Sequence, residues 1–223
     1  MVNHVQDGMD NEGRTDVLRG ESARESGFTL IEMVVTLAVF SILLTLAVPS
    51  LSRFVANSKV RSAADALQNG IRRAQVESLR RSRRVVFWLT TSQNPQTDLT
   101  AAQNGTNWAI TTIPSFVDST ETLQVIETGV LSSTVEGLIV KGPAAICFNS
   151  MGRLMTGADT QIASGACDPL PTGSPAVKSY QISVNKSDRP LRVDVSLAGQ
   201  VHMCDPAKTL SATSPDGCAA LTP

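Results

Sequence analysis

The pattern of apolar and polar positions divides the chain into three parts. Residues 1–27 are polar and charged and show no apolar periodicity. Residues 28–48 are apolar or weakly polar throughout, with one charged residue, Glu32. Beyond Pro49, apolar residues first recur every three or four positions and then alternate with polar ones. This order predicts one long helix over about residues 28–82, which Pro49 can kink without ending, followed by a β-rich domain over residues 84–223.

The first half of the predicted helix, residues 28–48, has the length of a membrane span. At about 1.5 Å per residue it extends over roughly 30 Å, the thickness of a bilayer core. A secretory signal peptide is the alternative. It would place its apolar region earlier in the chain and end in a small-residue cleavage site, whereas here Pro49 follows directly. The pattern therefore favours a retained transmembrane segment.

The second half of the helix, residues 49–83, is amphipathic. Its apolar residues form one stripe, which needs a partner surface: Val60, Ala63, Ala64, Leu67, Ile71 and Ala74. Because the later segments are strand-like, we expect this stripe to cover one face of an antiparallel sheet or sandwich. The predicted fold class is α+β, with the long N-terminal helix packed on an antiparallel β-domain.

Seven segments of the β-domain have strand character, and clusters of Gly, Pro, Asn and Ser separate them: 83–90, 107–114, 136–142, 144–150, 179–185, 191–197 and 200–204. The stretches "NSMGR" (149–153) and "LAGQ" (197–200) are typical of hairpin turns with a glycine near the tip. Residues 91–107 and 204–218 are predicted to be polar loops.

All four cysteines follow the predicted span: Cys147, Cys167, Cys204 and Cys218. No two are spaced as C-x-x-C, so a zinc ribbon is not indicated. An even number of cysteines in a small β-rich domain favours disulfides and an oxidising compartment over four buried reduced thiols. The flanking charges do not orient the span, because three cations lie on each side of it. The cysteines therefore place the β-domain outside the cytoplasm.

Four cysteines allow three disulfide connectivities. Pairing Cys204 with Cys218 closes a short loop, worth about 3 kcal/mol when the entropy of the unfolded chain is considered. This pairing leaves Cys147 for Cys167, a bond that would tie a strand to a polar loop. We favour this connectivity, and the other two remain open.

The composition gives little support to catalysis. The only histidines are His4 and His202, and no nucleophile, phosphate-binding or metal-ligand motif is present. Aromatic residues make up 4% of the chain, which argues against a base-stacking surface. We therefore expect no enzymatic activity, no cofactor and no metal.

A basic stretch, "RRSRR" (80–84), ends the predicted helix. It could contact phosphate or anionic headgroups. We favour solvation or packing against acidic groups of neighbouring subunits, together with complementation of the helix dipole.

The stretch "GFTLIEMVVTLAVFSILLTLAVP" (27–49), preceded by a polar leader and followed by an amphipathic helix and a β-domain, resembles type IV pilins and type II secretion pseudopilins. In that family a prepilin peptidase cuts after the glycine and N-methylates the new terminal residue. The resemblance implies cleavage between Gly27 and Phe28, removal of residues 1–27 and methylation of Phe28. A start at Met9 would shorten the leader without changing this motif.

The resemblance also offers a role for Glu32, whose unpaired carboxylate would cost roughly 2.5–3.5 kcal/mol in a bilayer. Cleavage creates a cationic amine at Phe28, about one helical turn away. The carboxylate can pair with this amine or, as the family implies, with that of a neighbouring subunit, and so set the register of assembly. The alternative is a glutamate that reaches the lipid headgroups from near the end of the span.

Three further stretches resemble minor pilins of the FimT/GspH family: residues 60–89, "ICFNSMGRL" (146–154) and "GQVHMCDPA…SPDGC" (199–218). The stretch 199–218 resembles the FimT type in particular. The implied partners are a prepilin peptidase, other pilins and the bacterial inner membrane, with the C-terminal domain in the periplasm. The implied function is a minor pilin that helps to initiate a type IV pilus. The alternative is a pseudopilin at the tip of a type II secretion fibre.

The resemblance also raises a role in DNA uptake, because some FimT-type minor pilins capture DNA during natural transformation, and DNA is then a further implied partner. DNA-binding members of the FimT type carry G-R-x-R at the turn before the tail cysteine. Here the turn reads Gly199-Gln200-Val201-His202, so both arginines are absent. Nearby candidates for compensation are Arg189, Arg192 and Lys208, but three aspartates are interleaved with them: Asp188, Asp194 and Asp205.

Overall fold

The computed structural model describes residues 27–115, 120–170 and 176–220, without the side chains of residues 46–49. The predicted leader, apart from Gly27, therefore lies outside the described residues. The chain consists of two compact units, Met1–Leu44 and Thr45–Pro223. One helix, α1 (Leu30–Arg81), contributes to both, close to the helix predicted over residues 28–82.

The part of α1 in the first unit is apolar and exposed along its described length. Within the described residues, no unbroken helix has both the length and the apolar character to cross a membrane. The stretches Leu30–Thr45 and Ser50–Arg81 satisfy that requirement only when taken together as a broken span, judged by length and composition.

The second unit buries the predicted apolar stripe of α1. All six stripe residues are at most 1% exposed. The helix ends where Ser82 adopts a left-handed conformation, with φ 50°. The amide of Ser82 donates to the carbonyl of Leu79, and that of Arg83 to Ser78, which together satisfy carbonyls of the last turn.

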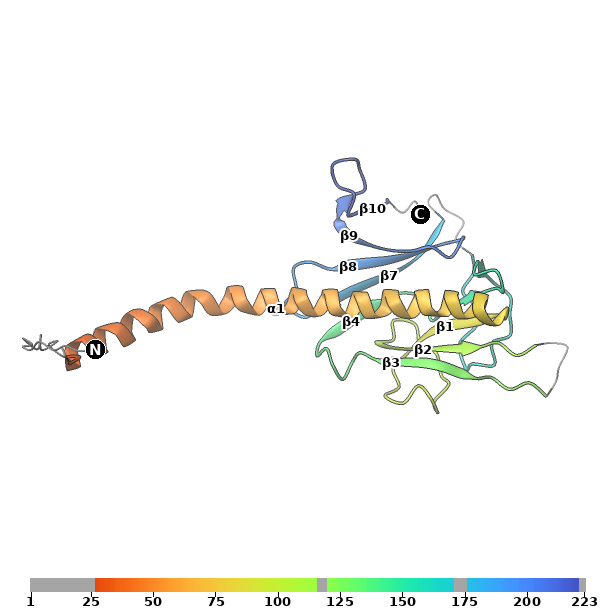
Figure 1. Ribbon diagram of the computed structural model, residues 1–223, viewed down its shortest axis with the longest axis horizontal. Helices are drawn as coiled ribbons and strands as arrows, with labels where there is room; N and C mark the ends of the chain where they lie inside the picture. The colour runs from red at the N-terminus through yellow and green to blue at the C-terminus, as the bar shows by residue number, and fades with distance from the viewer. Residues whose placement is uncertain (1–26, 116–119, 171–175, 221–223) are drawn as a thin grey trace, which may run out of the picture. The chain divides into compact units, whose positions relative to one another are not determined.

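In the described residues, the strands form two five-stranded sheets (Figure 1). The first has the order β3-β2-β1-β5-β6, with bounds β1 Val85–Thr90, β2 Asn107–Thr112, β3 Val125–Val130, β5 Ala145–Phe148 and β6 Leu154–Met155. The second has the order β10-β9-β8-β7-β4, with bounds β4 Leu138–Lys141, β7 Val177–Val184, β8 Leu191–Ser196, β9 Val201–Thr209 and β10 Gly217–Cys218.

The seven predicted strands are present, and β3, β6 and β10 are additional. The named strands pair antiparallel as predicted, except that the short β10 pairs with β9 in parallel. The two predicted hairpin turns connect β5 with β6 and β8 with β9. Gly152 (φ 72°) and Gly199 (φ 86°) supply the left-handed residue in each turn.

The main core lies where α1 meets both sheets. Figure 1 shows the C-terminal half of α1 lying along them, with β1–β3 on one side and β7–β9 on the other. Phe87 of β1 contacts Trp108 of β2 and, edge-on, Tyr180 of β7, with ring centroids 5.6 and 6.1 Å apart. These contacts join the two sheets into one hydrophobic core with the helix stripe.

A second apolar cluster covers the opposite face of the first sheet. It contains Val86 and Trp88 from β1 and Ala101 and Ile162 from the loops. The polar stretch 91–107 is therefore not a solvated loop alone. Backbone hydrogen bonds join Ala101 to Ala163 and Ala102 to Leu89, so this stretch covers a sheet face.

Candidate functional site

The predicted cleavage site is open in the structure. Phe28 is 78% exposed, and a Cβ built on Gly27 would meet nothing within 4 Å among the described residues. The fold of this part of the chain therefore places no steric demand for glycine at position 27. Any such requirement would have to come from an enzyme that reads the site.

Glu32 lies in the first turn of α1, three residues after the helix-capping residue Thr29. The Thr29 hydroxyl accepts a hydrogen bond from the Glu32 amide at 3.3 Å, and the Thr29 carbonyl accepts one from Met33. Thr-x-x-Glu is the sequence of a capping box. The Glu32 side chain is exposed, and no ion pair to it occurs in the described part of the chain.

The C-terminal turn is built around Gly199 and lies against α1. A Cβ on Gly199 would be 2.0 Å from the carbonyl oxygen of Gly152 and 2.4 Å from Nε2 of Gln75. Gln75 itself donates to that carbonyl at 3.1 Å. The side chains of Gln200 and His202, which follow in the turn and in β9, are exposed.

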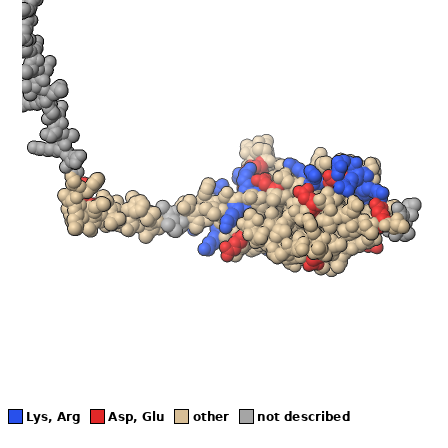
Figure 2. Space-filling view, turned by 60° about the horizontal axis from the view of Figure 1, so that its bottom comes forward, with Lys and Arg blue, Asp and Glu red and all other residues tan. Residues whose placement is uncertain are grey.

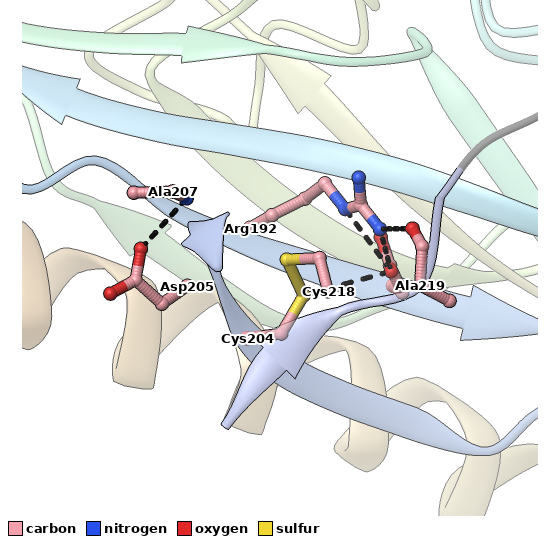
Figure 3. Close-up of a disulfide and its surroundings, with 7 residues drawn as sticks. Arg192, Cys204, Asp205, Ala207, Cys218 and Ala219 are labelled. Atoms are coloured by element: carbon pink, nitrogen blue, oxygen red, sulfur yellow. Dashed lines mark hydrogen bonds and ion pairs between the residues drawn. A yellow bond between two sulfur atoms is a disulfide. The ribbon is translucent and has the colours of Figure 1, made fainter. Parts of the chain in front are cut away.

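Arg192, one of the candidates for nucleic-acid contact, is already engaged inside the protein (Figure 3). Its guanidinium donates to Asp194 Oδ2 at 2.8 Å and to the carbonyl of Ala219 at 2.7 Å. The side chains of Arg192 and Asp194 are only 13% and 10% exposed. Arg192 therefore anchors the residue after Cys218 and is not available to a ligand at the surface.

Lys208 and Arg189, the other two cationic candidates for nucleic-acid contact, differ in their ion pairing. Lys208 forms an ion pair with Asp216 and lies 4.0 Å from Asp205. Arg189 is exposed and forms no ion pair within the described residues. The face drawn in Figure 2 carries groups of Lys and Arg with Asp and Glu between them. This mixture of charges favours a polyanion less than a continuous basic surface would.

Both disulfides have the connectivity that the sequence favours. Cys147 of β5 pairs with Cys167 in the loop that covers the first sheet. Cys204 of β9 pairs with Cys218 of β10 at the edge of the second sheet. The predicted polar loop over residues 204–218 is therefore only partly correct, because β9 continues to Thr209 and β10 covers Gly217–Cys218.

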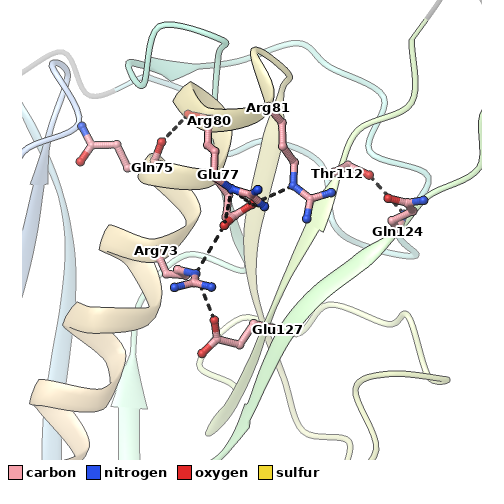
Figure 4. A network of polar contacts seen from close by, with 9 residues as sticks. Arg73, Gln75, Glu77, Arg80, Arg81, Thr112, Gln124 and Glu127 are labelled. Atoms are coloured by element: carbon pink, nitrogen blue, oxygen red, sulfur yellow. Dashed lines mark hydrogen bonds and ion pairs between the residues drawn. The ribbon is translucent and has the colours of Figure 1, made fainter.

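Arginines of the basic stretch 80–84 make ion pairs within the chain, while the side chains of Arg80 and Arg83 stay 61% and 46% exposed, in keeping with the predicted solvation. The buried carboxylate of Glu77 accepts hydrogen bonds from Arg80 at 2.6 Å and Arg81 at 2.7 Å (Figure 4). These bonds, from Arg80 first and then Arg81, lower the pKa of Glu77 to about 2. Arg83 pairs with Glu121 at 2.6 Å.

A groove that the sequence did not predict lies between α1 and the second sheet. It has a volume of about 1020 Å³, and its cations come from distant parts of the chain: Arg53 and Arg61 from α1, Arg189 from the β7–β8 connection and Lys208 from β9. We call it the basic groove. Asn57 connects its two walls, because its side chain donates to Asp188 Oδ1 at 2.6 Å and accepts from the amides of Asp188 and Arg189. The only signal in the sequence was the i, i+4, i+8 spacing of Arg53, Asn57 and Arg61 on one helix face.

Comparison with protein-family models gives two matches. Residues 22–48 match the prokaryotic N-terminal methylation motif, and residues 63–199 match the type II transport protein GspH. The second match covers more than half of the chain. The chain belongs to the GspH family.

The GspH match extends from the amphipathic half of α1 to the β8–β9 turn. The methylation motif includes the predicted cleavage site. The motif and the family together imply processing by a prepilin peptidase and assembly with other pilins. This GspH-family chain is thus a structural subunit of the pilin and pseudopilin class and not an enzyme.

Two crystal structures of the type IV minor pilin FimU from Pseudomonas aeruginosa PAO1 resemble this GspH-family chain. The first has 15% sequence identity and a TM-score of 0.42, and the match covers 70% of this chain and 95% of the FimU chain. The second has 16% identity and a TM-score of 0.39, with coverage of 66% and 94%. The sequence has no significant match among curated proteins.

Proposed function

We propose that the mature chain, residues 28–223, is a minor pilin that helps to initiate a type IV pilus. Residues 28–48 would anchor it in the bacterial inner membrane, residues 49–83 would complete the helix, and residues 84–223 would form the periplasmic domain. A pseudopilin at the tip of a type II secretion fibre is the alternative. Both share the same processing and the same helix.

The tail closed by Cys204–Cys218 is the observation that favours the pilus. It lies beyond the residues matched to GspH, which end at 199. It is nevertheless an ordered part of the second sheet, because β10 pairs with β9 and Arg192 binds the carbonyl of Ala219. The tail sequence resembles that of FimT-type minor pilins. An ordered element added to the GspH core supports a role at a pilus.

Deletion of the gene in the source bacterium separates the two roles. A minor pilin predicts loss of surface pili and of twitching motility, with secretion of type II substrates unchanged. Complementation with the wild-type chain should restore motility. Normal twitching together with a loss of protease secretion would support the pseudopilin and reject the pilus.

Glu32 supplies a test of assembly. We expect Glu32→Ala to leave cleavage after Gly27 intact, because the cleavage site itself is unchanged. Incorporation into the fibre should fall at least about tenfold, since an unmatched amine or carboxylate in hydrocarbon costs several kcal/mol. The measurement is the amount of chain in sheared pilus fractions relative to the amount of processed chain in the membrane.

Glu32→Asp is the matched control, because it keeps the charge on a shorter side chain. It should retain more incorporation than the alanine variant. Normal recovery of Glu32→Ala in the sheared fraction would reject pairing and leave Glu32 as a headgroup-facing residue.

DNA contact is the weaker candidate, and the geometry of the turn does not favour it. Arg192 is buried in an ion pair, while Gln200 and His202 lack the permanent charge of arginine. A salt titration of DNA binding by the mature chain in detergent tests this candidate. We expect weak binding by the wild type and a gain, steeply dependent on salt, for Gln200→Arg/His202→Arg. Salt-sensitive binding by the wild type would revive the role in DNA uptake.

A further inference from the structure

The basic groove combines unpaired cations with apolar side chains. In the described part of the chain, Arg53, Arg61 and Arg189 form no ion pair. Two of the aspartates at the groove have partners: Asn57 binds Asp188, and Lys208 binds Asp216. The hydrogen bond from Asn57 and then the charges of Arg189 and Arg53 lower the pKa of Asp188. The lining of the groove thus carries four cations, Arg53, Arg61, Arg189 and Lys208, against three carboxylates, Asp188, Asp205 and Asp216, which is an excess of one positive charge.

The apolar side chains of the groove come from both walls. Phe54 of α1 is 71% exposed, although it is one of the largest side chains of the helix. Leu191 and Met203 from the second sheet are half-buried and pack against the main core. Protein–protein interfaces are enriched in aromatic residues, Met and Arg. An exposed Phe beside Arg is therefore a feature expected of such an interface before its partner binds.

The groove adjoins a part of α1 that the domain leaves uncovered. Burial of α1 begins at Ala56, and the described side chains from Ser50 to Val55 are all exposed. Asn57 is four residues from Arg53, three from Phe54 and four from Arg61, so each of these side chains is its neighbour on one side of the helix. A subunit packed beside this helix would bury that side.

We propose that the basic groove receives an acidic segment of a neighbouring, different pilin subunit, in which carboxylates flank an apolar side chain. The carboxylates would bind the guanidinium groups of Arg53, Arg61 and Arg189, whose planar forks suit bidentate pairing. The apolar side chain would pack on Phe54. This inference rests on the proposed function, because it requires that the chain assembles with other pilins in a fibre.

The charge pattern favours such a segment over a polyanion. Asp188, Asp205 and Asp216 lie among the cations of the groove. A nucleic acid or an anionic membrane surface presents closely spaced phosphates, and these would be repelled by the aspartates. Carboxylates at separate positions on a folded partner can each meet one guanidinium and avoid the aspartates.

The test replaces Phe54 with the photoreactive residue p-benzoylphenylalanine in the full-length chain, expressed in its own bacterium. Irradiation should give a covalent adduct with another pilin. Arg61→Glu/Arg189→Glu in the same chain should reduce the adduct at least fivefold, and reduce recovery of the non-photoreactive variant in sheared fibres to a similar degree. Arg153→Glu is the matched control, because Arg153 is exposed and unpaired among the described residues but lies in the β5–β6 turn.

Several results would overturn the proposal. Adducts only with lipid, adducts only with a second copy of this chain, or an adduct that the double reversal leaves unchanged would each do so. Arg61→Gln/Arg189→Gln provides a milder variant, and its level and processing in the membrane fraction show that it folds. Wild-type chain in the sheared fibres reports on the proposed function separately. If it is absent there, the minor-pilin role fails; if it is present and the groove variants incorporate normally, only the groove assignment fails.

Discussion

At the scale of single residues, the buried carboxylate of Glu77 is the centre of a cluster of ion pairs near the end of α1. Glu77 is 2% exposed, and Arg73, Arg80 and Arg81 lie within 3.5 Å of its oxygens. Arg73 also lies 3.5 Å from Glu127 of β3, so the same cluster links the helix to the first sheet (Figure 4). Removal of the Glu77 carboxylate would leave three arginines, Arg73, Arg80 and Arg81, without the buried negative charge that they share.

We expect Glu77→Gln to abolish an acid-sensitive part of the free energy of unfolding. The pKa of Glu77 falls from 4.5 in the unfolded chain to about 2 in the folded one. Its contribution is therefore fully present above pH 4.5 and is lost as pH falls toward 2. The contribution is about 2 kcal/mol, since water screens the largely exposed Arg80. Denaturant unfolding of the wild type and the variant from pH 2 to 7 measures the difference.

Glu127→Gln is the control for this experiment. Glu127 is 45% exposed and takes part in one ion pair at 3.5 Å. Its replacement should change stability by less than about 0.5 kcal/mol at any pH. A difference between wild type and Glu77→Gln that does not vary with pH would refute the electrostatic origin.

Gly199 is the second residue whose replacement has a defined cost. Its φ of 86° disfavours any side chain, and a Cβ would clash with the Gly152 carbonyl at 2.0 Å. We expect Gly199→Ala to destabilise the domain by about 2–4 kcal/mol. Gly157→Ala isolates the conformational part, because Gly157 has φ 73° and nothing within 4 Å of a Cβ; it should cost about 1 kcal/mol. Thermal unfolding of both variants measures the difference. Equal losses would show that the contact with Gly152 is relieved by movement of the turn.

At the scale of elements, α1 has two kinds of surface. Buried side chains occur from Ala56 to Ser78, while the described side chains before Ala56 are exposed. This part, whose described side chains are exposed, includes most of the residues that match the N-terminal methylation motif. We attribute its exposure to a surface that other subunits or the membrane would cover.

Leu67 and Leu79 provide a matched comparison within this helix. Leu67 is 1% exposed and lies in the main core, whereas Leu79 is 50% exposed. Leu67→Ala should destabilise the domain by about 2–5 kcal/mol through loss of burial and creation of a cavity. Leu79→Ala should cost less than about 1 kcal/mol. Chemical denaturation at constant pH tests both, and similar losses would mean that the stripe has been assigned to the wrong face.

At the scale of the whole molecule, the second unit has one main core shared by both sheets and the helix. Phe87 joins β1 of the first sheet to β7 of the second through Tyr180. The amide of Leu154 in β6 donates to the carbonyl of Leu197 beyond β8, which adds a backbone link between the sheets. We infer that the two sheets do not unfold independently.

Amide hydrogen exchange tests this inference. Central amides of β1, such as Phe87, and of β8, such as Val193, should exchange through the same global opening, with free energies equal within about 1 kcal/mol. Leu67→Ala should lower both values by the same amount, because Leu67 belongs to the shared core. A loss confined to one sheet would show two cooperative units instead of one.

The sequence by itself determined the long helix, the buried stripe from Val60 to Ala74, seven of the strands and the two glycine turns. Each of these features depends on the periodicity of neighbouring residues or on the conformational freedom of a single residue. Both properties can be recognised from a short stretch of sequence. The disulfide pairing was favoured for a similar reason, since loop length is a property of the sequence.

Only the tertiary structure decided how these elements combine. Contacts between distant segments produce the division into two sheets and the parallel β9–β10 pair. They also place the loop residues Ala101 and Ile162 in the apolar cluster with Trp88. Local sequence did not reveal that Arg192 is buried against Asp194, or that Arg53 and Arg189 share one groove, because folding brings these residues together over long chain separations. A residue's charge can be read from the sequence, but whether that charge is free to bind a partner depends on what the fold places beside it.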